Sequence, residues 1–305
     1  MTMRHATLRQ LQVFESAARH LSFSRAADEL HLTQPGVSMQ VRDLEAAAGL
    51  PLFERIGRRI AITEAGSALL RHTREVVRAL ADAEDALDAL KGLRAGRINL
   101  GVTSTAKYFA PQLLARFRDR HPSLAFRLAV SNREAVIESL AENAVDLAIM
   151  GRPPEAPATV AAAFAPHPLV VIASPAHPLA RRRRIPVTAL AEESFLVREP
   201  GSGTRSAMQG FFADHGVAIR VGMEMASNET IKQAVMAGMG VAFLSRHTIG
   251  LELAANRLAV LDVRGLPVMR QWFVVHLASK RLSPTAQAFR AFVQKHGRAL
   301  LAEAT

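Results

Sequence analysis

The chain has 305 residues, of which 49% are hydrophobic and 21% are charged, and it contains no cysteine. This length suggests two or three globular domains, and the composition excludes a wholly disordered chain. The lack of cysteine excludes disulfide scaffolds, thiolate zinc sites and cysteine nucleophiles. No apolar run approaches the ~20 residues that a membrane-spanning helix needs, and the first residues do not have the pattern of a secretory signal. We therefore expect a cytoplasmic protein with no membrane partner.

The net charge of +11 is distributed unevenly along the chain. Residues 1–92 contain twelve basic and twelve acidic side chains, whereas residues 93–305 contain twenty-six basic and fifteen acidic ones. A nucleic-acid site in the first segment would therefore depend on a few well-placed arginines. The surplus in the second segment indicates either an anionic ligand or only a soluble surface.

Three short segments of the first sixty residues have helical periodicity. Apolar spacing predicts a helix over residues 7–20. Ser22 or Ser24 can cap a second helix that contains residues 25–30, and Thr33 can cap a third. Two helices joined by a short turn are the layout of a helix-turn-helix, whose second helix enters the DNA major groove.

Polar side chains on the third helix and a basic hairpin after it form a candidate DNA site. The outward-facing residues expected on that helix are Gln34, Ser38, Gln40 and Arg42. Side chains of these types read base edges or bind phosphates. Residues 53–62 predict a hairpin, and the arginines near its tip that would contact phosphates are Arg55, Arg58 and Arg59. The pattern favours a winged helix-turn-helix, and the alternative is a three-helix bundle with a solvated arginine loop.

Residues 64–92 contain no proline and predict one long helix. Its apolar positions are separated alternately by four and three residues, which is typical of a coiled-coil seam. The seam residues that we select are Leu69, Val76, Leu80, Ala83, Leu87 and Leu90. A helix of this length, about 43 Å, is longer than one small domain covers. We therefore expect it to join two copies of the chain, and the alternative is packing against its own C-terminal domain.

From Arg97 onwards, short apolar runs alternate with helical stretches, which predicts α/β units with largely parallel strands. The expected strands are 98–102, 125–130, 145–150, 169–173, 195–197, 219–225, 241–244 and 272–277. The expected helices are 111–120, 133–142, 204–215, 228–237 and 284–301.

The N-terminal motifs resemble the signature of the LysR-type transcriptional regulators. The matching segments are residues 23–38, 44–45, 49, 52–55 and 63–66. The resemblance extends over essentially the whole chain and implies a mixed α+β and α/β fold. Its parts would be a winged helix-turn-helix DNA-binding domain in 1–63, a dimerisation helix in 64–92 and a periplasmic-binding-protein-like α/β effector domain in 93–305. It adds Arg25, Thr33 and Pro35 to the expected DNA contacts, and it implies promoter DNA, RNA polymerase and a dimer or tetramer of this chain as partners.

The effector domain implied by this resemblance has two lobes, one from 93–165 and 269–305 and the other from 166–268. Ligands of open α/β sheets bind beyond the carboxyl ends of strands, and these ends should face the cleft between the lobes. A glycine turn flanked by Arg198 and Arg205 opens one helix, which suits a phosphate or carboxylate. The full set of expected effector-binding residues is Thr103, Ser104, Thr105, Lys107, Asn132, Arg133, Gly151, Arg152, Arg198, Gly201, Ser202, Gly203, Thr204, Arg205 and Asn228. Each segment alone is also consistent with an ordinary capped loop.

A closer resemblance, to CbbR-type regulators of Calvin-cycle operons, lies in the effector domain. The matching segments are residues 104–111, 132–134, 146–155 and 198–205. This resemblance implies an activator of carbon-fixation genes with no resident cofactor or metal. Its effector would be a sugar phosphate, phosphoenolpyruvate or NADPH. The alternatives are a LysR-type regulator of another pathway that senses a carboxylate, and a two-lobed binding protein or enzyme.

Ser104 and Lys107 have the Ser-x-x-Lys spacing of penicillin-recognising hydrolases. The companion motifs of those enzymes are absent from the sequence. We therefore expect no catalytic residues and no enzyme.

Overall fold

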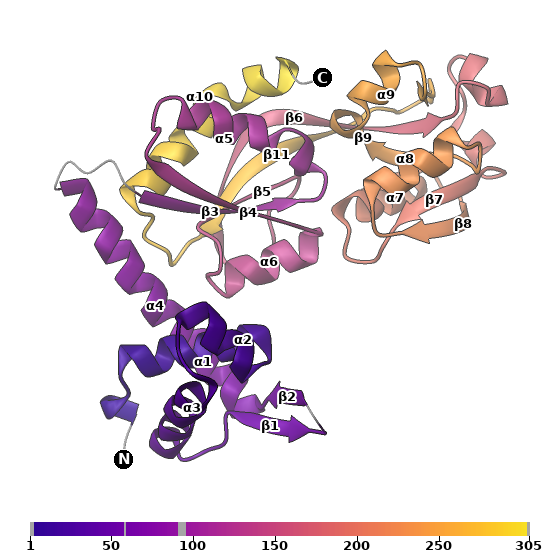
Figure 1. Ribbon diagram of the computed structural model, residues 1–305. Helices are drawn as coiled ribbons and strands as arrows, with labels where there is room; N and C mark the ends of the chain where they lie inside the picture. Colours follow the sequence, from indigo (N-terminus) through magenta and orange to yellow (C-terminus); the bar gives the residue numbers. More distant parts are fainter. Residues whose placement is uncertain (1–2, 58, 91–95, 304–305) are drawn as a thin grey trace. The chain divides into compact units, whose positions relative to one another are not determined.

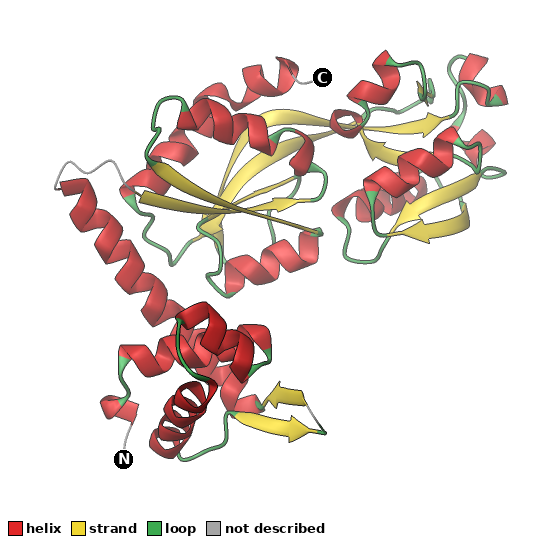
Figure 2. Cartoon of the chain, viewed as in Figure 1, coloured by secondary structure: helices red, strands yellow, loops and turns green. Residues whose placement is uncertain are grey.

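The structure is a computed structural model that describes residues 3–57, 59–90 and 96–303. It consists of two units, Met1–Leu87 and Asp88–Thr305 (Figure 1). The first unit is helical apart from one hairpin, whereas the second combines strands and helices (Figure 2). Among the described residues, no helix is both long and apolar enough to cross a membrane.

Three helices form the body of the first unit after a short 3-10 turn. They are α1 (Leu8–His20), α2 (Phe23–Leu30) and α3 (Gln34–Ala48). The helix starts read from the sequence are confirmed, because the side chains of Ser22 and Thr33 each accept a hydrogen bond from a first-turn N–H group. Gly49 ends α3 with φ of 71°, a conformation that favours glycine. Val13, Val37 and other small apolar side chains fill the space between the three helices.

The wing is the expected hairpin, formed by β1 (Phe53–Ile56) and β2 (Arg59–Ile62), with Gly57 at positive φ in its turn. Hydrogen bonds hold its base: Glu45 Oε1 accepts from the N–H of Leu52 at 2.8 Å, and Thr63 Oγ1 donates to the carbonyl of Pro51 at 2.7 Å. A Cβ on Gly66 would lie 2.2 Å from the Leu52 carbonyl oxygen. The LysR-like motif residues around the wing therefore have structural roles.

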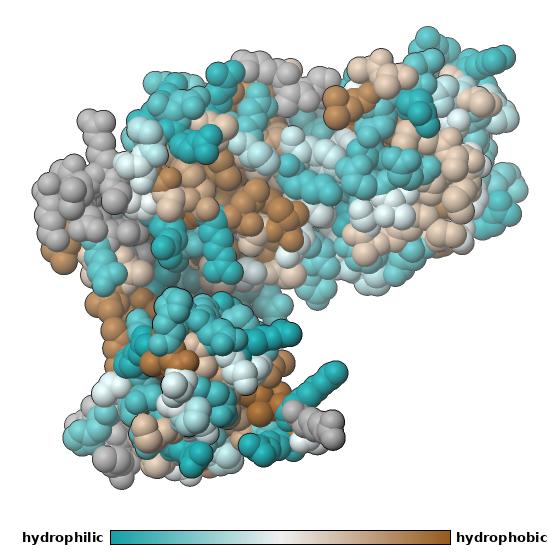
Figure 3. Space-filling view, in the orientation of Figure 1, coloured by the Kyte–Doolittle hydropathy of each residue, from teal (hydrophilic) through white to brown (hydrophobic). Residues whose placement is uncertain are grey.

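The long helix α4 (Glu64–Leu90) begins in the core of the first unit, where Leu69 is half-buried, and then exposes its apolar side chains. Val76, Leu80 and Leu87 are 50%, 41% and 55% exposed. Figure 3 shows hydrophobic side chains gathered along this helix. Leu69 thus packs partly against the core of its own chain. The side chain of Leu90 lies outside the described residues. The side chains of Val76, Leu80 and Leu87 are therefore largely exposed on this chain.

The second unit has two lobes joined by two long strands. In the first lobe, β3 (Gly96–Thr103) pairs in parallel with β4 (Leu124–Ser131) and β5 (Leu147–Met150). The strands β6 (Thr159–Ala173) and β11 (Val268–Leu277) run antiparallel to each other and cross into the second lobe (Figure 1).

The second lobe extends β6 and adds a separate parallel pair. β9 (Ala242–Ser245) and β10 (Ala259–Val260) pair antiparallel with β6. β7 (Ser194–Arg198) and β8 (Arg220–Met225) pair in parallel. The expectation of largely parallel strands is therefore wrong for the crossover region, because a chain that passes between lobes and returns must place the two crossing strands antiparallel.

Helices cover both faces of each lobe. The first lobe has α5 (Ala110–Arg118) and α10 (Pro284–Glu303) over one core and α6 (Arg133–Ala141) over the other. The second has α7 (Gly203–Asp214) and α8 (Asn228–Met236) over two further cores, and a short α9 (Gly250–Ala254). The 3-10 helices are η1 (Met3–His5), η2 (Ala106–Tyr108), η3 (Pro178–Arg181), η4 (Val187–Leu190) and η5 (Arg246–Thr248).

Candidate effector cavity and DNA-binding face

A cavity of about 370 Å³ lies between the two lobes of the second unit. Its walls come from the end of β3, the start of α6, the loop after β5, the two crossover strands and the start of α7. The lining residues are Thr103, Ser104, Thr105, Arg133, Ile137, Gly151, Arg152, Pro154, Glu155, Ala156, His167, Leu169, Ser202, Gly203, Thr204, Ser206, Arg270 and Trp272. We call this space the interlobe cavity.

Nine of the fifteen residues expected at an effector site line this cavity: Thr103, Ser104, Thr105, Arg133, Gly151, Arg152, Ser202, Gly203 and Thr204. The other six are not among its lining residues: Lys107, Asn132, Arg198, Gly201, Arg205 and Asn228. The loops that border the cavity were thus predicted correctly, but only some of their residues line it.

Three arginines converge on the interlobe cavity. Arg133 donates from Nη2 to the carbonyl of Pro153 at 3.2 Å, and its Nε is buried without a hydrogen-bond partner among the described residues. Arg152 forms an ion pair with the exposed Glu155 at 2.8 Å. Burial lowers the pKa of Arg133 and of Arg270, and the charge of Arg152 lowers both further. Because these like charges repel one another, a bound anion would stabilise the cluster.

The crossover strands form one wall of the cavity. Arg270 on β11 is paired in register with His167 on β6, so both side chains lie on the same face of the ribbon, and Trp272 follows two residues later. The rings of His167 and Trp272 stack at 3.9 Å with an interplanar angle of 16°. A Cβ on Gly151 would lie 2.7 Å from His167 Nδ1, so the close approach of this loop requires glycine.

His167 is buried in this wall with both ring nitrogens free of partners among the described residues. Burial, and then the charges of His247 and Arg270, lower the pKa of His167 to about 3. The ring is therefore neutral near pH 7, with one nitrogen able to donate a hydrogen bond and the other able to accept one. His167 thus places two unpaired polar atoms in the wall of the cavity that it lines.

The N-terminus of α7 contributes backbone N–H groups. The side chain of Ser202, the residue before the helix, makes no capping hydrogen bond. The first N–H groups of a helix have no partner within the helix, and its dipole favours negative charge there. Ser202 and Thr204 are buried, with 4% and 6% of their surface exposed. This end of α7 is suited to bind a phosphate or carboxylate group.

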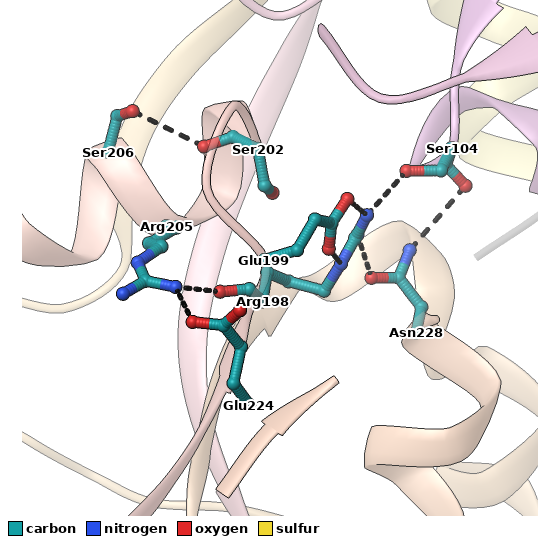
Figure 4. Close-up of polar contacts among 8 residues, drawn as sticks. All are labelled: Ser104, Arg198, Glu199, Ser202, Arg205, Ser206, Glu224 and Asn228. Carbon is teal, nitrogen blue, oxygen red and sulfur yellow. Dashed lines mark hydrogen bonds and ion pairs between the residues drawn. The ribbon is translucent and has the colours of Figure 1, made fainter. Parts of the chain in front are cut away.

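Arg198 has a different role from the one expected, because it ties the two lobes together (Figure 4). It is 3% exposed and donates from Nη2 to Ser104 Oγ at 2.9 Å and from Nη1 to Asn228 Oδ1 at 2.5 Å. Glu199 pairs with Arg198 Nε at 2.7 Å. The guanidinium and Asn228 are thus already satisfied within the protein, and they hold the loop after β3 against the second lobe.

The four other predicted residues outside the cavity also have local structural partners. Arg205 donates to the carbonyl of Arg198 at 2.8 Å and forms an ion pair with Glu224 (Figure 4). Asn132 caps α6. Lys107 Nζ lies 5.2 Å from the centre of the neighbouring Tyr108 ring, and Gly201, at positive φ, passes close to Glu134.

Three residues of the cavity wall, His167, Arg270 and Trp272, were not expected at this site from the sequence. Residues 159–168 contain four alanines and two prolines, so they have no strand-like pattern, and the expected strand began only at residue 169. Extending both crossover strands and alternating their side chains would have placed these three residues on one face.

The predicted DNA-binding residues lie mainly on the surface of the first unit. Arg25, Thr33, Gln34, Pro35, Arg42, Arg55 and Arg59 are exposed, Ser38 and Gln40 are half-buried, and Arg58 lies outside the described residues. Arg42 donates to Ser38 Oγ at 3.1 Å, one helical turn away, so these two share a face of α3. Gln40 is about 200° around the helix from Ser38 and does not share that face. On the hairpin, Arg55 pairs with Ile60 and Arg59 with Ile56, so the two arginines project from opposite faces.

Comparisons with known protein families decide the identity of both units. Residues 8–67 match the model "Bacterial regulatory helix-turn-helix protein, lysR family", and residues 91–298 match "LysR substrate binding domain". This chain belongs to the LysR family of transcriptional regulators. The helix-turn-helix, the long helix α4 and the two-lobed α/β unit are the parts expected of a LysR-type regulator. The chain is therefore a regulator and not an enzyme.

Individual relatives of this LysR-type regulator are similar over nearly its whole length. It is 53% identical to the HTH-type transcriptional regulator CbbR of Rhodospirillum rubrum, covering 97% of this chain and 99% of the relative. It is 52% identical to the RuBisCO operon transcriptional regulator of Allochromatium vinosum, covering 95% and 96%. The solved regulatory domain of CcmR from Synechocystis PCC6803, in complex with 2-PG, is 44% identical with a TM-score of 0.63, covering 65% of this chain and 96% of that domain.

Proposed function

We propose that this LysR-type protein acts in the cytoplasm as a CbbR-like regulator of a RuBisCO operon and senses a small phosphorylated anion. The observation that carries the proposal is the meeting of Arg133, Arg152 and Arg270 with the N-terminus of α7 in one cavity. The identity of about half of all residues to CbbR and to a RuBisCO operon regulator supports the choice of target genes.

The size of the interlobe cavity favours a small effector. Its volume of about 370 Å³ lies near the lower end of the range for ligand pockets, about 300–1,000 Å³. A phosphorylated acid or sugar phosphate suits this volume better than NADPH does. The related CcmR domain was solved with 2-PG, 2-phosphoglycolate, which carries one phosphate and one carboxylate.

The lining suggests how such a molecule is oriented. The N–H groups at the start of α7, with the hydroxyls of Ser202 and Thr204, are suited to one anionic group. Arg270 and Arg133 are suited to the other, because guanidinium groups bind carboxylate and phosphate oxygens through two parallel hydrogen bonds. The neutral His167 supplies one further donor and one acceptor. Since these groups come from both lobes, the effector binds more tightly when the lobes are close, and this difference in affinity is what shifts the protein between states.

The same proposal assigns the remaining regions. The DNA-binding domain comprises residues 1–63, with base contacts from α3 and phosphate contacts from the wing. The long helix α4 is the dimerisation helix, and its exposed stripe joins two copies in a dimer or a dimer of dimers. The effector domain comprises 93–305, and RNA polymerase is the further partner at the promoter.

The only tryptophan of the chain, Trp272, lines the interlobe cavity and gives a direct test. Trp272 fluorescence of the full-length chain is titrated with 2-phosphoglycolate, phosphoenolpyruvate, a sugar bisphosphate, NADPH and a simple dicarboxylate. We expect saturable changes with the small phosphorylated compounds. Arg270→Gln should weaken this binding by about tenfold or more, because a charge-assisted hydrogen bond is lost.

The matched control is Arg264→Gln, which removes the same charge from an exposed position of the second lobe. It should leave the titration unchanged. A response to the dicarboxylate with none to any phosphorylated compound would instead indicate a LysR-type regulator of another pathway. Equal weakening by both variants would mean that only net charge matters, and would contradict the proposed site.

A further inference from the structure

A second cavity, of about 450 Å³, lies in the first lobe beside the C-terminal helix. It is lined by residues from the end of β11, the following loop and one face of α10. The residues that matter here are His276, Arg281, Gln287, Arg290, Ala291 and Gln294. We call it the α10 pocket. It shares no lining residue with the interlobe cavity.

His276 gives this pocket an unused acceptor. It follows Trp272 and Val274 on the face of β11 that packs toward the core under α10, and it is 7% exposed. Its Nδ1 lies 2.9 Å from the carbonyl of Leu277, which can only accept, so Nδ1 carries the proton. Nε2 is buried with no hydrogen-bond partner among the described residues. Burial lowers the pKa of His276, and the charge of Arg290 lowers it further, so the ring is neutral and Nε2 needs a donor.

Helix α10 supplies hydrogen-bond donors and positive charge to the pocket. Arg290, Ala291 and Gln294 follow Gln287 by three, four and seven residues, so they lie on the same side of the helix. The Nε of Arg290 is buried without a hydrogen-bond partner among the described residues. None of the described residues that line the pocket is acidic. Its positive charge is therefore not neutralised from within.

The loop that carries Arg281 is held in place. Lys280 Nζ binds Asp146 at 2.9 Å and Asn143 at 2.7 Å, with the Lys280 side chain 5% exposed. Two residues after Arg281, Ser283 Oγ accepts from the N–H of Ala286 and caps α10. The backbone on both sides of Arg281 is thus held in place before any ligand binds, which lowers the entropic cost of ordering this loop.

We propose that the α10 pocket binds a second small oxyanion, one that also carries a hydroxyl donor, such as hydrogen phosphate or a hydroxylated phosphate ester. Arg290 and Arg281 bind the charged oxygens, and the hydroxyl donates to His276 Nε2. Sulfate has the same shape and charge but no proton to donate near neutral pH. It therefore serves as the discriminating probe.

The test uses the full-length chain with Arg270→Gln, which weakens the interlobe cavity, and follows the imidazole NMR signals of His276. These signals are assigned by their loss in His276→Gln. We expect saturable shifts with inorganic phosphate and glycerol phosphate, and binding of sulfate that is about tenfold weaker or more. Adding Arg290→Gln should weaken phosphate binding about tenfold or more. Arg264→Gln, which removes the same charge from an exposed position in the second lobe, should leave it unchanged.

The exposed Gln294→Glu separates lost binding from lost folding, because it adds negative charge at the rim of the pocket without removing a buried group. It should weaken phosphate binding while the melting temperature stays at that of the parent. Non-saturating shifts, equal affinity for sulfate and phosphate, or phosphate affinity that both variants leave intact would each overturn the proposal. Because Trp272 reports the interlobe cavity and His276 reports the α10 pocket, failure of one site is distinguishable from failure of the other.

Discussion

Arg198 and Ser104 join the two lobes through a hydrogen bond of 2.9 Å between Nη2 and Oγ, although they lie 94 residues apart in the chain. The bond is made at the edge of the interlobe cavity, since Ser104 also lines that cavity. A ligand that contacts Ser104 therefore acts on a residue that already holds the lobes together. Under the proposed function, this contact would connect occupancy of the cavity to the arrangement of the lobes.

Removing the Arg198 side chain should destabilise the effector unit more than removing its partner. Arg198→Met leaves Glu199 and Asn228 without their buried donor, and we expect a loss of about 3 kcal/mol in the free energy of unfolding. Ser104→Ala removes one charge-assisted hydrogen bond and should cost about 1.5 kcal/mol. Urea unfolding followed by Trp272 fluorescence measures both. A loss for Ser104→Ala that equals or exceeds that for Arg198→Met would contradict this account of the contact.

Arginines on α3 and the wing should determine the salt dependence of promoter binding. Arg42→Ala and Arg55→Ala each remove an exposed cation from the proposed DNA face. If each contacts one phosphate, the slope of log affinity against log salt should fall by about 0.9 per variant. Arg118→Ala removes the same charge from an exposed position in the effector unit and serves as control. Slopes that are the same for all three variants would sink the assignment of these two arginines.

The exposed stripe of α4 should be needed for self-association. Leu80→Glu places a charge in the centre of the stripe, next to Val76, and should shift the protein toward monomers in sedimentation velocity. Arg71→Glu, an exposed change about 180° around the helix from Leu80, should preserve the oligomer. Identical sedimentation of both variants and the native chain would show that another surface joins the subunits.

Glu29 should make the stability of the first unit depend on pH in the acid range. It accepts hydrogen bonds from Arg19, His20 and Ser16, and the bond from Arg19 is the main cause that lowers the pKa of Glu29 to about 2. Because its pKa is lower in the folded state, this carboxylate stabilises the first unit at pH values above its unfolded pKa of 4.5, and the contribution is lost as the pH falls through about 2.

Circular dichroism melting curves of the native chain and Glu29→Gln test this pH dependence. The side chain is 37% exposed, so solvent screens the pair and the variant should lose only about 1 kcal/mol or less near neutral pH. The difference between the two proteins should shrink between pH 4.5 and 2. A difference that stays constant over that range would assign the effect to packing instead of charge.

Local signals in the sequence predicted the first unit well. The capping residues Ser22 and Thr33 and the turn glycine Gly57 act within a few residues of their own position, so their effects can be read from the chain. The direction of Arg198 could not be read in this way. Its partners Ser104 and Asn228 come from distant segments, and only the packed lobes show that the guanidinium is already paired.

The crossover strands also contain residues whose position depends on distant parts of the chain. Arg270 and His167 face the cavity because β11 and β6 pair in a particular register, and that register depends on contacts across about a hundred residues. A glycine-rich loop such as 201–203 marks a candidate anion site through its own composition. A histidine between two prolines does not, because its function depends on the strand that lies beside it.

The central claim is that a small phosphorylated anion in the interlobe cavity changes how this regulator binds promoter DNA. The most direct measurement is the affinity of the full-length chain for a RuBisCO-operon promoter fragment, with and without 2-phosphoglycolate, for the native protein and Arg270→Gln. The account predicts a change of about fivefold or more in the native protein, which is usual for allosteric coupling, and no change in a variant that still binds DNA. An effector response that persists undiminished in Arg270→Gln would contradict it.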